Sequence, residues 1–95
     1  MTQAESAQYS RTEFIDTKRV LLRDVGRDRI TQRDVLLRLR RRYDQLLQRF
    51  LREPGTTYAV WLEHGPKDEL DEVLAAARDA AVWDRLVDKY ATRPG

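Results

Sequence analysis

The chain has 95 residues and no cysteine, so we expect one small domain held together by apolar packing, without disulfides or thiolate zinc sites. Its net charge of +2 is unevenly divided, because residues 11–53 hold thirteen Lys/Arg against seven Asp/Glu, whereas residues 54–95 hold five against eight. No apolar run approaches the ~20 residues that cross a bilayer, and the polar N-terminus has no secretory-signal pattern. We therefore expect no membrane span and a cytoplasmic protein.

The first ten residues are polar, and we expect residues 1–10 to form a disordered tail. Ser10 is followed three positions later by Glu13, which is the spacing of a capping box at the start of a helix. Apolar residues then recur at helical intervals up to Gly26, a residue type that often follows the end of a helix. The sequence therefore predicts a first helix over residues 11–25.

Residues 32–53 have the pattern of a long amphipathic helix. Thr31, with Asp34 three residues later, gives a second capping signal, and Pro54 with Gly55 ends the pattern. Five apolar residues in this segment alternate spacings of three and four, which is the a/d pattern of a coiled coil. These residues, which we call the a/d seam, are Leu36, Leu39, Tyr43, Leu46 and Phe50.

Residues 57–64 predict a short helix that is capped by a threonine and turns Trp61 inward. The β-branched residues at its start also permit a strand over residues 56–62, which would need residues 19–25 as its partner strand. The alternative to an all-helical chain is therefore an α+β fold with one short two-stranded element.

Residues 67–91 predict a helix pair or a bent helix. The acidic cluster at residues 68–72 suits the positive end of a helix dipole. Two apolar stripes follow that differ by well over 90° around a helix, so one straight helix cannot bury both against one neighbour. Either the helix breaks near residues 81–84, or its end packs on something else, which could be Trp61 and the first helix or a partner protein. The second stripe, which we call the docking patch, consists of Trp83, Leu86, Val87 and Tyr90. Residues 92–95 are expected to be frayed.

These elements predict an all-α fold, a small bundle of four to five helices around the long central helix, in one domain over residues 11–91. The a/d seam and the docking patch together offer apolar surface for contact with another chain. We therefore expect a non-catalytic protein-interaction module that acts through helix packing and self-associates as a homodimer. A phage- or plasmid-type inhibitor that docks on a host protein fits the same features.

The polar side of the central helix raises a second functional class. Five arginines, which we call the arginine ridge, repeat the apolar rhythm on the opposite side: Arg38, Arg41, Arg42, Arg49 and Arg52. Because arginine binds phosphate oxygens in pairs, the alternative function is that of a small nucleic-acid-binding protein. A solvated helix face gives the same pattern, and the sequence leaves the choice open. Arg40, at the edge of the apolar side, is expected either to pair with the acidic cluster or to extend its charge into solvent.

Catalysis and cofactor binding are not indicated. His64 is the only histidine, and the acidic cluster lacks the glycine and the ligand alternation of a calcium loop. There is no glycine-rich phosphate loop and no serine in a nucleophile-elbow context. We therefore expect no enzyme activity, no metal, no cofactor and no small-molecule ligand.

Overall fold

The computed structural model describes residues 1–91, and this range contains five helices and no strand. In chain order the helices are α1 (Gln3–Gly26), α2 (Gln32–Leu51), α3 (Tyr58–His64), α4 (Lys67–Ala76) and α5 (Ala80–Ala91). The predicted all-α fold is confirmed. The two-stranded alternative is wrong, because residues 19–25 lie in α1 and residues 58–62 lie in α3. The expectation of a frayed end at residues 92–95 concerns residues outside the described range.

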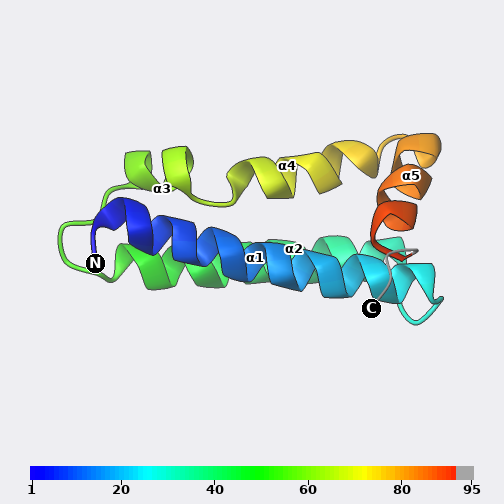
Figure 1. Ribbon diagram of the computed structural model, residues 1–95, viewed down its shortest axis with the longest axis horizontal. Helices are drawn as coiled ribbons and strands as arrows, with labels where there is room; N and C mark the ends of the chain where they lie inside the picture. The colour runs from blue at the N-terminus through cyan, green and yellow to red at the C-terminus, as the bar shows by residue number, and fades with distance from the viewer. Residues whose placement is uncertain (92–95) are drawn as a thin grey trace.

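The two long helices form the base of the molecule. Figure 1 shows α1 and α2 side by side and antiparallel, with α3 and α4 following one another along the same side of the pair and α5 crossing its end. A Cβ atom on Gly26 would lie only 2.5 Å from Cβ of Ala91, so the missing side chain allows the end of α5 to approach the end of α1. Helix α1 therefore contacts α3 near one of its ends and α5 near the other.

The N-terminal segment differs from the prediction of a disordered tail. Helix α1 begins at Gln3, where the Thr2 hydroxyl accepts a hydrogen bond from the Glu5 backbone N–H, and Ser6 and Ala7 are buried. The Ser6 hydroxyl lies 2.7 and 2.8 Å from the two carboxylate oxygens of Glu53, just beyond α2. The burial of Ser6 and Ala7 and the contact of Ser6 with Glu53, which hydropathy does not reveal, order this stretch.

The central helix begins as predicted. The Thr31 hydroxyl accepts from the Asp34 backbone N–H at 3.2 Å, and the Asp34 carboxylate accepts from the Thr31 backbone N–H at 3.1 Å, which completes a capping box. Helix α2 ends at Leu51, two residues before the predicted end, and Gly55 then adopts the left-handed φ of 77° in the turn that leads to α3.

The break in the C-terminal segment is confirmed, but it comes earlier than residues 81–84. Helix α4 ends at Ala76, and α5 begins at Ala80 after a short turn. The Asp79 carboxylate accepts from the Ala81 backbone N–H at 3.0 Å, so it satisfies one of the free donors at the start of α5. Leu70 and Val73 of the first stripe are buried on α4, and the second stripe lies on α5, whereas the last two residues of the first stripe, Ala80 and Ala81, are exposed at the start of α5.

A cluster of four aromatic rings forms one end of the core. Trp61 of α3 is fully buried, and its indole N–H donates to the Tyr43 hydroxyl at 2.9 Å. Tyr43 meets Phe14 of α1 and Trp61 edge to face, with ring centroids 6.1 and 5.5 Å apart, and Phe50 lies 5.4 Å from Trp61. These contacts join α1, α2 and α3 at one end of the bundle.

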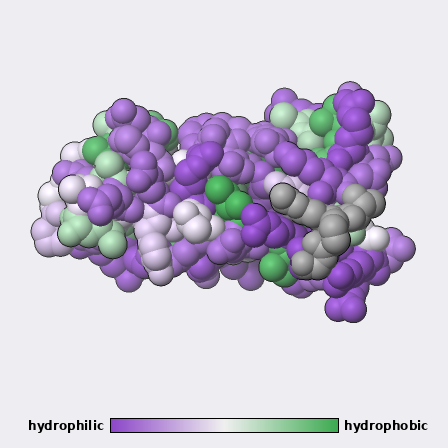
Figure 2. All heavy atoms as spheres, in the orientation of Figure 1, coloured by the Kyte–Doolittle hydropathy of each residue, from purple (hydrophilic) through white to green (hydrophobic). Residues whose placement is uncertain are grey.

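The exterior is mostly polar. Figure 2 shows hydrophilic residues over most of the visible face, with hydrophobic residues gathered over α3 and over the corner between α4 and α5. Of the large apolar side chains there, Leu62 is 43% and Val82 is 36% exposed. None of the helices in the described part of the chain is long and apolar enough to cross a bilayer.

Candidate functional site

The a/d seam lies inside the chain. Leu39, Leu46 and Phe50 are at most 1% exposed, and Leu36 and Tyr43 are partly buried against the same core. The seam is covered by α1 and α3, as the ring contacts of Tyr43 and Phe50 show. Packing within one chain therefore accounts for its apolar spacing, and a second chain could reach it only if the helices separated.

The docking patch is covered in the same way. Trp83, Leu86, Val87 and Tyr90 are each 7 or 8% exposed and belong to the common core. Val87 and Tyr90 face α1, since Val87 lies beside Gly26 and the Tyr90 ring lies 5.7 Å from the Lys18 ammonium group. The apolar surface that the sequence assigned to a partner protein is thus used to attach α5 to α1.

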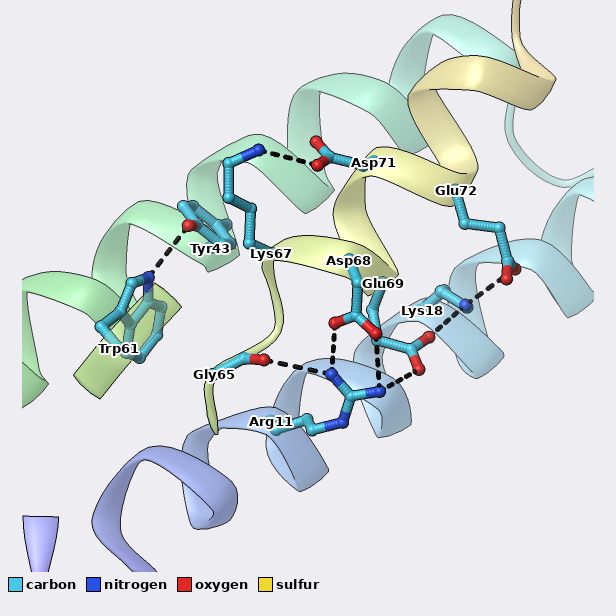
Figure 3. Close-up of polar contacts among 10 residues, drawn as sticks. All are labelled: Arg11, Lys18, Tyr43, Trp61, Gly65, Lys67, Asp68, Glu69, Asp71 and Glu72. Carbon is cyan, nitrogen blue, oxygen red and sulfur yellow. Dashed lines mark hydrogen bonds and ion pairs between the residues drawn. The ribbon is translucent and has the colours of Figure 1, made fainter. Parts of the chain in front are cut away.

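The acidic start of α4 is bound by two cations of α1 (Figure 3). The Arg11 guanidinium donates to the Gly65 carbonyl at 3.1 Å and to the Glu69 carboxylate at 2.9 Å, and it also pairs with Asp68. The Lys18 ammonium group is 1% exposed and lies 2.5 Å from Glu69. Its second partner is Glu72 at 3.1 Å. We call these five charged residues the α1–α4 ion cluster.

Of the two alternatives for Arg40, pairing with the acidic cluster is wrong, and extension of its charge into solvent agrees with the structure. Arg40 is exposed and forms no ion pair with any residue of the described part of the chain. Sequence reasoning missed Lys18, although a signal was present. Lys18 lies four residues after Phe14 and three and four before Leu21 and Leu22, so it occupies the apolar stripe of α1. A lysine in such a stripe needs a buried carboxylate partner.

The pKa directions of Lys18 and Asp68 favour the charged forms of these two members of the α1–α4 ion cluster. Burial alone would lower the Lys18 pKa, but the hydrogen bonds and charges of Glu69 and Glu72 outweigh it, so the pKa is raised. The hydrogen bond from Arg11 lowers the pKa of Asp68 below its ordinary value. Lys18 and Asp68 are therefore held in their ionised forms, which suits a structural contact.

The side of α2 that faces solvent is strongly basic. Its exposed residues, which we call the α2 outer face, are Arg33, Leu37, Arg38, Arg40, Arg41, Asp44, Gln45, Gln48, Arg49, Leu51 and Arg52. Six arginines thus accompany a single acidic residue. Arg33, Arg38, Arg40, Arg41 and Arg52 form no ion pair within residues 1–91.

The predicted arginine ridge is divided by the fold. Arg42 and Arg49 lie at the edge next to α1, where the Glu13 carboxylate accepts a hydrogen bond from Arg42 at 3.3 Å and forms an ion pair with Arg49 at 2.9 Å. Arg49 also donates to the Ser10 hydroxyl at 3.3 Å, and its guanidinium lies 5.8 Å from the Tyr9 ring. The Ser10–Glu13 spacing therefore reflects an interhelical contact, and the predicted capping box there is wrong.

The described residues offer no cluster of three or more His, Asp or Glu side chains able to hold a metal ion. His64 lines a polar cleft of about 460 Å³ together with Arg11, Asp68 and others. Its nearest charged partner is the adjacent Glu63 at 3.8 Å. Comparison of this chain with protein-family models, curated proteins and solved structures found no match.

Proposed function

We propose that this protein is a non-catalytic nucleic-acid-binding module and that the α2 outer face binds the phosphate backbone. The observation that supports the proposal is the group of five exposed arginines on one helix face with no ion-pair partner in the described chain. Folding alone does not require them, because the cations that hold the bundle together are others, namely Arg11, Lys18, Arg42 and Arg49.

The dimensions of this face suit an extended anion. From Arg33 to Arg52 the helix rises ~28 Å, which is enough to follow several phosphates along a duplex. Arginine is suited to this contact because its planar guanidinium donates two parallel hydrogen bonds to phosphate oxygens.

The charge of the remaining helices favours one orientation of the protein toward a polyanion. Residues 54–91 hold eight Asp/Glu against four Lys/Arg, and they form α3, α4 and α5, away from the α2 outer face. A molecule with one basic and one acidic side turns its basic side toward a polyanion during approach. The same distribution disfavours a symmetric dimer through α2, because two arginine-rich faces would repel each other.

Fluorescence anisotropy with a labelled DNA duplex of mixed sequence tests the proposal. We expect binding that weakens with salt, with a log–log slope of magnitude about 0.9 for each phosphate neutralised. Replacing Arg38 and Arg52 by Gln should reduce that slope by about 2 and weaken binding to every duplex. The pair Arg78→Gln and Arg85→Gln, two exposed arginines outside α2, is the matched control. Absence of salt-dependent binding, or equal loss in the control, would refute the proposal.

A protein-interaction module, the function first expected from the sequence, is the second candidate. The surface that favours this function is neither the a/d seam nor the docking patch. It is formed by Tyr58 and Leu62, which lie one turn apart on α3 and are 48% and 43% exposed. Aromatic and aliphatic side chains of this kind anchor protein interfaces. Light scattering after size exclusion distinguishes a monomer from a homodimer, and Leu62→Asp should dissociate a dimer formed here. Leu62→Asn, which adds no charge, should weaken it less.

A further inference from the structure

We propose that α2 is a recognition helix that lies in the major groove of duplex DNA and reads base sequence along the midline of its outer face. This inference rests on the proposed function. It adds that the ligand is B-form DNA and that binding depends on sequence.

The α2 outer face has a midline and two flanks. At ~100° per residue, Leu37, Arg41, Asp44 and Gln48 fall within about 60° of one another on the exposed arc, and this strip, the midline, is bordered about 20° further out by Arg33 on one side and by Arg52 on the other. Arg33 and Arg40 lie on one flank. Arg38, Arg49 and Arg52 lie on the other, and all nine side chains are exposed. Basic residues thus border the face on both sides, whereas its middle is chemically mixed.

The two flanks match the rims of a groove. A helix with its side chains is ~10–12 Å across, and the B-DNA major groove is ~12 Å wide with phosphates along both edges. When the midline faces the floor of the groove, Arg33 and Arg40 of one flank and Arg38 and Arg52 of the other extend toward opposite phosphate strands. A phosphate contact from both sides fixes the register of the helix, which base readout requires.

The midline carries the side-chain types that distinguish bases. In the major groove arginine donates to guanine, glutamine makes paired hydrogen bonds with adenine, and a carboxylate accepts from the cytosine amino group. An aliphatic side chain such as Leu37 contacts the thymine methyl group. The order Leu37, Arg41, Asp44 and Gln48 advances by four, three and four residues, so these groups follow one another along the groove.

Asp44 is the residue that a purely electrostatic surface does not explain. It is exposed in the middle of the arginines, within one turn of Arg40 and Arg41, yet forms no ion pair with any described residue. A carboxylate at that position repels phosphate and weakens general polyanion binding. The position of Asp44 is explained when its carboxylate faces a hydrogen-bond donor on a base edge. Gln48 lies one turn further along the helix, and its side chain has no hydrogen-bond partner in the described chain.

Single-stranded nucleic acid and duplex RNA fit this face less well. Single strands are bound by stacking on exposed aromatic rings. The α2 outer face contains no such ring, and the nearest, Tyr9 on α1, lies against Arg49. The major groove of A-form RNA is too narrow for a helix to enter. B-form DNA is therefore the ligand that the geometry favours.

Selection of duplexes from a randomised DNA library, followed by anisotropy at fixed salt, tests the inference. We expect an enriched motif that binds at least tenfold more tightly than a scrambled duplex, since one bidentate base contact discriminates by roughly 5- to 150-fold. Asp44→Ala and Gln48→Ala should remove most of this preference while binding to the scrambled duplex persists. Arg38→Gln should instead weaken both duplexes by the same factor. Gln8→Ala, an exposed change on α1, is the control, and circular dichroism checks that each variant is folded.

The outcomes separate the two proposals. Salt-dependent binding without an enriched motif, or equal affinity for an RNA duplex of the selected sequence, would overturn the recognition helix and leave the proposed function standing. A motif whose preference survives both midline variants would also overturn it. Failure to bind any nucleic acid would remove the proposed function itself.

Discussion

Lys18 carries a buried charge, and the carboxylate that compensates it can be identified by substitution. Glu69 is the closer partner, at 2.5 Å and 18% exposed, whereas Glu72 lies at 3.1 Å and is 50% exposed. Glu69→Gln leaves a cation that is 1% exposed with only the half-exposed Glu72 beside it. Removing one partner of a buried ion pair costs about 3–5 kcal/mol, and since Glu72 remains we expect about 2–3 kcal/mol.

The companion variants should cost less. Glu72→Gln removes a partly solvated carboxylate, so we expect about 1 kcal/mol or less. Lys18→Met replaces the buried cation by an apolar side chain of similar length and removes the cost of burying the charge. Glu69 keeps its 2.9 Å contact with Arg11 in that variant. We therefore expect the change in the free energy of unfolding for Lys18→Met to lie within about 1.5 kcal/mol of zero.

Urea denaturation followed by far-UV circular dichroism and tryptophan fluorescence measures all three variants. For a chain of this length 1 kcal/mol corresponds to about 4–8 °C in Tm, so Glu69→Gln is resolved by thermal melting as well. A loss for Lys18→Met as large as that for Glu69→Gln would refute the reasoning. It would mean that the attraction within the cluster exceeds the cost of burying the lysine, and that the ion pairs themselves stabilise the attachment of α4.

Three further predictions concern caps, packing and pH. Thr31→Ala removes the side-chain acceptor of the α2 capping box and should lower the free energy of unfolding by about 1 kcal/mol in urea titrations, whereas Thr31→Ser should not. Gly26→Val places a branched side chain where even a Cβ lies 2.5 Å from Ala91, so α5 should detach, and hydrogen exchange should increase in α5 before α2. The lowered pKa of Asp68 contributes stability that is present above the ordinary Asp pKa of about 4 and is lost as pH falls through the folded value, so Asp68→Asn should flatten the acid limb of the stability curve.

Helix positions were largely predictable because they depend on local signals. The 3.6-residue rhythm, the Thr31–Asp34 capping box and the turn at Pro54 and Gly55 lie within a few residues of the boundaries that they mark. The rotation between the two C-terminal stripes predicted separate α4 and α5 for the same reason. The break was predicted a few residues too late because several aspartates in this segment could cap a helix. The one that does so is Asp79, whose carboxylate accepts from the Ala81 backbone N–H.

The failures share a different cause. Ser6, Ala7 and Ser10 are buried where the N-terminal turns pack on the rest of the bundle, and such small side chains give no hydropathy signal. The partners of Arg11 and Lys18 lie more than fifty residues away along the chain. No local spacing in the sequence could therefore show that these two cations, and not Arg40, pair with the acidic cluster. Glu13 shows the same limit, because a sequence pattern typical of a cap proved to be half of an interhelical ion pair.

The apolar pattern of α2 also bears on where its function lies. A stripe with a/d spacing indicates that something covers one side of a helix, and it is satisfied equally by a second chain or by neighbours in the same chain. Here α1 and α3 cover it, so the stripe contains no information about partners. The opposite side differs, because uncompensated like charges on adjacent turns of a helix are destabilising. Arg38 and Arg41, and likewise Arg49 and Arg52, are like charges three residues apart, so they oppose folding slightly, and an anionic ligand that neutralises them would remove this cost.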